Sequence, residues 1–145
     1  LCCQAREAGC FLGSIGSYYS DKQEKIAFIA GGATVVKLTG DGLGGRNQEI
    51  ALAAAAEIAG KRNLAVFSIG SDGTDGPTDA AGGYVDGDSA RALQQQGISI
   101  ADVLCRNDAY HGLAACDGLL ITGPTGTNVN DVSVVLIDPE AGKQE

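Results

Sequence analysis

The distribution of glycine is the sequence feature that most limits how this chain can fold. There are 22 glycines among 145 residues, about twice the usual share of roughly 7%. The excess gathers in residues 40–45, 70–87 and 118–126. Loops in these regions follow apolar runs that are typical of strands. We therefore expect flexible, ligand-accessible loops at strand ends, where α/β sheets place their binding crevices.

Apolar periodicity predicts a succession of strands and helices. We expect strands at residues 33–39, 64–70, 118–123 and 132–138, and helices at 1–9, 47–60, 89–97 and 107–116. The helix at 1–9 should stop at Gly9, and within residues 10–30 the segment 21–24 suggests a short helix. The apolar run "LAVFSIG" at 64–70 is typical of a strand buried on both faces in a parallel sheet. These elements indicate an α/β fold, with a layered mostly parallel or mixed sheet flanked by helices.

Composition and charge limit the classes of binding partner and the cellular compartment that we expect. The length is that of one ordinary domain, and no apolar run approaches the roughly 20 residues of a membrane span. The net charge is -8 and the lysines and arginines are scattered, so we expect neither nucleic acid nor membranes as partners. Five cysteines without a C-x-x-C pair indicate reduced thiols in the cytoplasm. The start lacks both a signal peptide and a methionine, so we expect a processed or excised piece of a longer protein.

The first glycine-rich loop, residues 40–46, carries a candidate anion site. Gly40, Gly42 and Gly45 have the spacing G-x-G-x-x-G of a dinucleotide fingerprint. The loop leads into an expected helix whose first N–H groups favour an anion. Arg46 adds a planar fork of donors suited to phosphate or carboxylate. The alternatives are a Rossmann cofactor loop and a plain turn with a solvated arginine.

The other two loops are rich in side-chain oxygens. Residues 71–83 contain Asp72, Asp75 and Asp79, which suit a Mg²⁺ ion or a proton acceptor for a hydroxyl nucleophile. Residues 122–131 contain glycines, threonines and asparagines that can approach and bind an anion. Ordinary turn chemistry explains either loop equally well. We expect all three loops to cluster on one face of the domain.

Four motifs taken together resemble one known family. "GLGGRNQE", "SDGTDGPTDAAG", "RNDAY" and "TGPTGTNVNDV" occur in this order, as in the C-terminal MOFRL domain of class II glycerate kinases, the glycerate 2-kinase family. The resemblance implies ATP-dependent phosphorylation of D-glycerate to 2-phosphoglycerate with Mg²⁺. Older naming of such proteins keeps an NAD(P)-dependent hydroxypyruvate reductase as a competing function. A non-enzymatic ligand-binding module is a third.

The resemblance also implies a set of site residues. The catalytic candidates are Arg46, Asp72 and Asp75, and the two aspartates are candidate Mg²⁺ ligands. The candidates for binding substrate or phosphate are Gly42, Gly44, Gly45, Asn47, Thr78, Asp79, Asn107, Thr125, Thr127 and Asn128. The motifs further include Glu49, Asp108, Tyr110 and Asn130. A dinucleotide site would need an acidic residue about 20 positions after the glycines, at the tip of the next strand. Asp72 lies 27 positions after Gly45, which counts against the reductase.

The resemblance finally implies a division into domains. Residues 31–145 would form the MOFRL-like α/β domain, and residues 1–30 a remnant of, or an interface with, a missing N-terminal domain. That larger α/β domain carries a catalytically important lysine in the family, so we expect this chain to be inactive alone. The family also usually has a glutamate where this chain has Ala33. The expected partners are a small hydroxy acid, a nucleotide and the missing domain, with a homodimer as an open alternative.

Overall fold

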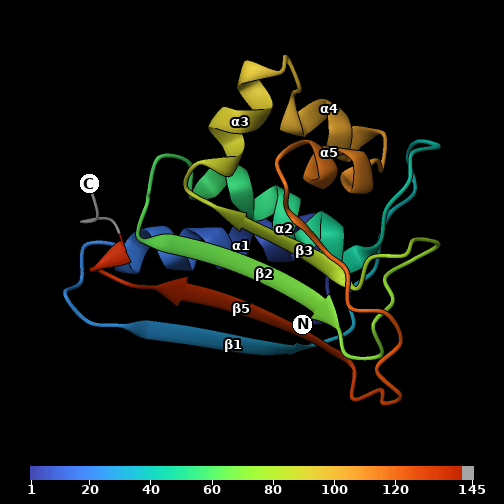
Figure 1. Cartoon of the computed structure of the whole chain (residues 1–145), viewed down its shortest axis with the longest axis horizontal. Coiled ribbons are helices and arrows are strands. Elements are labelled where there is room, and N and C mark those ends of the chain that lie inside the picture. The colour runs from blue at the N-terminus through green and yellow to red at the C-terminus, as the bar shows by residue number, and fades with distance from the viewer. Residues whose placement is uncertain (142–145) are drawn as a thin grey trace.

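The sheet at the centre of the fold is antiparallel throughout. A computed structural model describes residues 1–141. The strands lie in the order β1-β5-β2-β3-β4, and each pair of neighbours is antiparallel (Figure 1). The strands are β1 Ile26–Gly32, β2 Leu64–Gly70, β3 Gly82–Asp86, β4 Leu119–Leu120 and β5 Asp131–Ile137. The helices are α1 Ala5–Tyr19, α2 Arg46–Glu57, α3 Ser89–Gln95, α4 Ile100–Cys105 and α5 Ala109–Ala115. The expectation of a mostly parallel or mixed sheet is therefore wrong.

The physical reason for this error lies in β2. Its residues alternate between buried and half-buried, so one face of the strand packs inward and the other is covered only partly. An apolar run predicts burial, but it carries no information on the direction of the neighbouring strands. The neighbour on one side is β5, the last strand of the chain, which runs antiparallel to both β1 and β2. On the other side β3 returns from β2 within the glycine-rich segment that was expected to be only a loop.

Most expected helices are confirmed, whereas several boundaries are wrong. The helices expected at 47–60, 89–97 and 107–116 correspond to α2, α3 and α5, and the last two expected strands to β4 and β5. The helix expected to stop at Gly9 continues to Tyr19, and residues 21–24 form a turn rather than a helix. β1, β3 and α4 were not expected.

Residues 33–39 are not a strand of the sheet, although their side chains are largely β-branched. β1 ends before them, and Val35 makes only an isolated bridge to Gln4. The backbone groups of Lys37 and Thr39 bond instead to the side chain of Asn107. A side chain thus takes the place of a neighbouring strand. β1 spans residue 30, where we expected one domain to end and the next to begin. The division into domains stays a prediction. Residues 142–145 of the second expected domain lie outside the described residues.

The core lies between one face of the sheet and the helices α1 and α2. α2 is buried at most of its positions, including the fully buried side chains of Ile50 and Leu52. Its alanine-rich surface lets α1 approach closely, and Gly9 and Gly13 of α1 face it without side chains. The first turn of this buried helix is nevertheless polar, at residues 46–49. Buried polar groups require hydrogen-bond partners, and these partners build the site described below.

We predict that Gly9→Ala destabilises the fold. A Cβ atom at this position would lie 2.7 Å from the Cβ of Ala53, so the helices would have to separate. Such overpacking costs about 1–3 kcal/mol, more than the roughly 1 kcal/mol that alanine gains over glycine in a helix. The free energy of unfolding in urea should therefore fall. Gly31→Ala is the control, because a Cβ there would meet its nearest neighbour at 3.8 Å. Unchanged or increased stability of Gly9→Ala would contradict the packing described.

Candidate functional site

A pocket of about 740 Å³ opens at the end of the sheet where β2 ends and β5 begins. Its walls come from four segments that are far apart in the sequence, within residues 34–49, 72–77, 107–109 and 128–131. The three glycine-rich loops meet at this end of the molecule, on the right in Figure 1. The expectation that they cluster is confirmed. The volume lies within the range of about 300–1,000 Å³ that is usual for small-molecule sites.

Asp75 holds the second loop against the start of α2. Its buried carboxylate accepts hydrogen bonds from the backbone N–H groups of Asn47, at 3.1 Å, and Gln48, at 2.8 Å. The Asn47 side-chain amide donates a third, at 3.2 Å. These N–H groups have no carbonyl partner within the helix. The helix end that could have held a ligand anion is therefore already capped by a carboxylate of the chain itself.

Asp75 is closely packed against the first glycine-rich loop and the start of α2. Burial raises the pKa of its carboxyl above the usual range, against the effect of the N–H donors. A Cβ atom at Gly45 would overlap the Asp75 carboxyl group. The main chain of Asp75 is also fixed, because its carbonyl accepts hydrogen bonds from the side chains of Gln48, at 3.1 Å, and Thr78, at 2.8 Å. The second loop is thus fastened to α2 at several points.

The G-x-G-x-x-G spacing has a packing explanation. A Cβ atom at Gly40 or Gly42 would lie 2.5 or 2.6 Å from the carbonyl oxygen of Arg106. The N–H of Gly42 donates to that oxygen at 2.8 Å. The glycines therefore let the loop lie directly on the turn between α4 and α5. In the described residues the loop follows no strand, and the sheet contains no parallel βαβ unit, so the context of a dinucleotide fingerprint is missing.

Asn107 fixes the same loop from the side. This residue has a left-handed backbone, with φ 56°, which asparagine tolerates better than most residues. Its side-chain oxygen accepts hydrogen bonds from the N–H groups of Thr39, at 2.7 Å, and Gly40, at 2.9 Å. Its amide donates to Glu49 at 3.4 Å, and Glu49 in turn pairs with Arg6 of α1 at 3.1 Å. One network, buried at Asn107 and Glu49, therefore joins the glycine loop to α1 and α2.

Arg46 is held over the pocket by Asp131. The arginine is the first residue of α2, and its Nε and Nη2 donate to the two carboxylate oxygens of Asp131, the Nη2 bond being 3.1 Å. Asp131 is buried and begins β5, where it lies between Gly32 of β1 and Gly70 of β2. The Arg46 side chain is 42% exposed and lines the pocket. The pocket wall thus carries a guanidinium that is already fixed in position.

Asp72 joins the second loop to the third. One of its oxygens accepts hydrogen bonds from the N–H and the hydroxyl of Thr74, both at 3.0 Å. The other accepts from the amide of Asn128 at 3.2 Å. The hydrogen bond from the Thr74 backbone lowers the pKa of the Asp72 carboxyl, so this group is ionised at neutral pH. It places a negative charge on the wall of the pocket.

Comparison with known proteins now gives the family. Residues 26–131 match the MOFRL family. The chain belongs to the MOFRL family. It is 50% identical over 141 residues to the D-glycerate 2-kinase of Thermotoga maritima. The aligned region covers 94% of this chain and 34% of that relative. It is 41% identical over 145 residues to the glycerate 2-kinase of Pyrococcus horikoshii, covering 97% of this chain and 33% of the relative.

A solved structure supports the same relationship. The crystal structure of glycerate kinase from Thermotoga maritima aligns with a TM-score of 0.90 at 50% sequence identity. The alignment covers 94% of the present chain and 34% of the solved one. This MOFRL chain therefore spans about a third of the length of the relatives it matches.

The expected site residues of this MOFRL chain fall into two groups. Those that line the pocket are Gly42, Gly44, Gly45, Arg46, Asp72, Asp75, Asn107 and Asn128. The others are Asn47, Thr78, Asp79, Thr125 and Thr127, which bond to neighbouring loops and side chains. Among these, Asp79 is exposed and accepts a hydrogen bond from the Tyr110 hydroxyl at 2.8 Å. Ligand contact stays a prediction for both groups.

Some residues of the pocket wall were not expected from the sequence. Asp131 pairs with Arg46 across 85 positions, yet an aspartate before an apolar strand looks like a turn residue. Thr34, Val35 and Leu38 also line the pocket. They lie in a segment that was expected to be a strand, so its loop conformation concealed them. Only the three-dimensional pairing of Arg46 identifies Asp131.

The aspartates of the pocket wall already accept hydrogen bonds from the chain itself, which limits how they could hold a metal ion. Among the described residues, no group of three or more His, Cys, Asp or Glu side chains is arranged to hold a metal ion. Both oxygens of Asp75 accept N–H groups, and both oxygens of Asp131 bond to Arg46. Both oxygens of Asp72 also accept hydrogen bonds, from Thr74 and from Asn128. The described part of the pocket therefore offers no ready-made set of carboxylate ligands for a metal ion.

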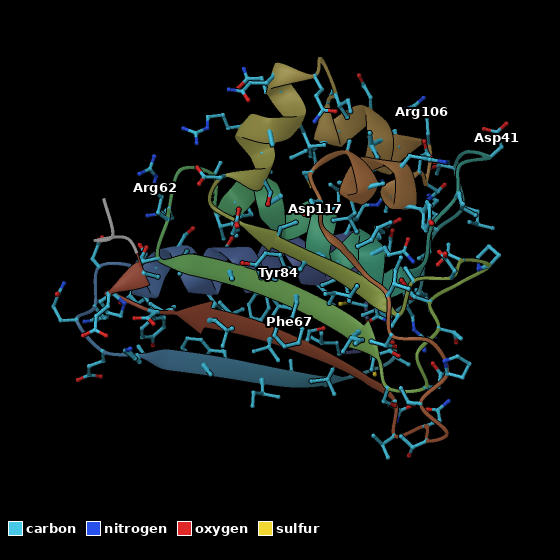
Figure 2. The ribbon with its side chains drawn as sticks, in the orientation of Figure 1. Asp41, Arg62, Phe67, Tyr84, Arg106 and Asp117 are labelled. Atoms are coloured by element: carbon cyan, nitrogen blue, oxygen red, sulfur yellow. The ribbon has the colours of Figure 1, made fainter. Side chains whose placement is uncertain are left out.

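We predict that Asp75→Asn destabilises the protein by about 1–3 kcal/mol, because an amide would turn a donor toward buried donors. Urea unfolding followed by circular dichroism measures this loss. Asp41→Asn is the matched control: Asp41 is exposed at the glycine loop (Figure 2), and surface substitutions usually stay within about 0.5 kcal/mol. Equal stability of the two variants would show that Asp75 does not hold α2.

Proposed function

We propose that this chain is the C-terminal MOFRL part of an ATP-dependent glycerate kinase, which phosphorylates D-glycerate to 2-phosphoglycerate. The observation that carries the proposal is the pocket in which Asp131 fixes Arg46. It occurs in a chain that is 50% identical to a protein named D-glycerate 2-kinase. Glycerate is a small carboxylate and ATP is a polyanion. Because the pocket wall also carries carboxylates, both ligands require a cationic group there.

Phosphoryl transfer requires mainly positioning and charge neutralisation. Arg46 is suited to bind either the glycerate carboxylate or the transferred phosphoryl group, because its planar fork is already oriented. Asp72 is suited to accept the proton of the attacking hydroxyl or to contact a Mg²⁺ ion held with the nucleotide. Bound Mg²⁺ would supply neutralisation of phosphate charge. Asp75 remains a proposed Mg²⁺ ligand, although its carboxylate also caps the start of α2.

The remaining two-thirds of the full-length protein would supply the other wall of the site. The pocket lies at the surface of this chain, and phosphoryl transfer to a hydroxyl requires that water be excluded. We therefore expect no turnover by the 145 residues alone. In the proposed division, residues 1–30 contact the N-terminal domain, and the exposed rings of Phe11 and Tyr18 suit such a contact. A cytoplasmic location belongs to the same proposal, since the five cysteines are free thiols.

The direct test is an assay of the purified full-length protein. ADP release with D-glycerate, ATP and Mg²⁺ should be measured, and phosphorus NMR should identify the product as 2-phosphoglycerate. Oxidation of NADH or NADPH with hydroxypyruvate should be measured in parallel. Reductase activity without kinase activity would overturn the proposal, and activity of the 145-residue chain alone would overturn the proposed division of labour.

We predict that Arg46→Ala lowers kcat of the full-length enzyme on the order of 10³-fold, as the loss of a charge-stabilising arginine can. Arg46→Lys should recover part of the rate, because lysine keeps the charge and loses the fork. Arg91→Ala is the control, since Arg91 is exposed on α3 and pairs with the nearby Asp88. A rate for Arg46→Ala within a few-fold of the Arg91→Ala rate would remove Arg46 from the mechanism.

We further predict that Asp72→Asn raises the Mg²⁺ concentration needed for half-maximal kinase activity, because the pocket loses its carboxylate ligand. A Mg²⁺ titration at fixed nucleotide concentration measures the change. Asp117→Asn is the control: Asp117 lies in the turn between α5 and β4 (Figure 2). If Asp72→Asn and Asp75→Asn both leave the Mg²⁺ dependence unaltered, the metal lies elsewhere in the enzyme.

A further inference from the structure

The sheet has a second face, on the side opposite α1 and α2. Cross-strand register places Ile29, Val134, Phe67 and Tyr84 in one row across four strands. Ile69 and Leu136 lie on the same face, two positions along their strands from Phe67 and Val134. We call these six residues the outer sheet face. Figure 2 shows Phe67 and Tyr84 on the near side of the sheet, with α1 and α2 behind it, and within residues 1–141 no helix packs over them.

The outer sheet face is apolar where a solvated face would be polar. An antiparallel sheet with one face in water normally alternates apolar inward residues with polar outward ones. Here the outward positions of β1, β2 and β5 are apolar, and most of the inward ones are apolar as well, apart from Ser68, Asp131 and Ser133. Ile29 is 73% exposed and Leu136 is 40% exposed. Strands with apolar residues on both faces are typical of sheets covered on both sides, and exposed apolar patches mark interaction surfaces.

The position of this face relates it to the pocket. At one end of β5, Val132 faces outward as Val134 does, two positions along the strand. Val132 directly follows Asp131, whose carboxylate holds Arg46 in the pocket wall. At the other end, Lys25 pairs with Asp138 at 3.3 Å and with Glu140 at 2.7 Å. A polar rim around an apolar centre is the usual composition of an interface. A body that covers the outer sheet face therefore also reaches the edge of the pocket.

We propose that the outer sheet face is a domain interface, covered by the part of the full-length polypeptide that lies outside these 145 residues. The matched relatives extend well beyond this region, since the chain covers only 34% of the solved Thermotoga structure. A covalently connected domain has a high effective concentration and covers the face in every molecule. A second copy is disfavoured, because each copy carries a net charge of -8 and two such copies repel.

Hydroxyl-radical footprinting of the full-length protein, read by mass spectrometry, tests this interface without relying on kinase activity. Oxidation rates of Ile29 and Phe67 should be compared with that of Val66, which faces inward from the same strand as Phe67 and is 0% exposed. The unfolded protein supplies the intrinsic rates. The Ile29 rate should fall on the order of tenfold below the rate that 73% exposure implies, since the residue becomes part of a packed core.

Two outcomes would overturn the proposal. Oxidation of Ile29 and Phe67 at rates that match their exposure in this chain would show that no domain covers the face. Protection that disappears on dilution, together with a dimer-to-monomer change in sedimentation velocity, would assign the face to a second copy. Protection equal to that of Val66 and independent of concentration, in a monomer or in an oligomer that does not dissociate over the same dilution, supports the domain interface.

Discussion

The buried carboxylate of Asp75 is the group on which the organisation of the pocket depends. It satisfies the first N–H groups of α2, a helix so deeply buried that water cannot satisfy them. The same contact fixes the second loop beside the start of α2, the helix that begins at Arg46. The absence of a side chain at Gly45 is a direct consequence, because the carboxyl group occupies that space. The glycine motif is therefore first a packing motif.

The two ion-binding features of the site are both engaged by the chain itself. Asp75 caps the helix end, and Asp131 binds the guanidinium of Arg46. In the proposed function, anion recognition would therefore rely on the fixed Arg46 rather than on an open helix terminus. Groups held in place before the reaction cost little reorganisation during it. The buried strand position of Asp131, between β1 and β2, makes this orientation a property of the sheet.

Local patterns in the sequence predicted α2, α3 and α5 and the meeting of the loops, but not α4, the length of α1 or the partners across the fold. The alanine-rich segment at 47–60 indicated α2, and glycine clustering indicated the loops. The strand directions were wrong, because apolar runs such as 64–70 report burial and not the identity of the neighbouring strand. Residues 33–39 have strand composition, yet Asn107 satisfies their backbone. Asp131 was missed because its role depends on a residue 85 positions away.

The apolar character of β2 on both sides is informative in its own right. It misled the prediction of strand direction, and its outward apolar residues are part of the surface that we propose as an interface. Within residues 1–141, α1 and α2 cover one face, and the other face adjoins the pocket. Site and interface thus share the strand β5, which begins at the ion pair with Arg46 and continues as the centre of the outer sheet face.

Amide hydrogen exchange of the wild-type and Asp75→Ala proteins tests most directly whether Asp75 organises the pocket. We expect faster exchange at the N–H groups of Asn47 and Gln48 and across residues 71–78 in the variant. Exchange in β1, which makes no contact with Asp75, should stay the same, so that global unfolding is separated from local release. Unchanged exchange at Asn47 and Gln48 would contradict the account, because these amides would then be protected without the carboxylate.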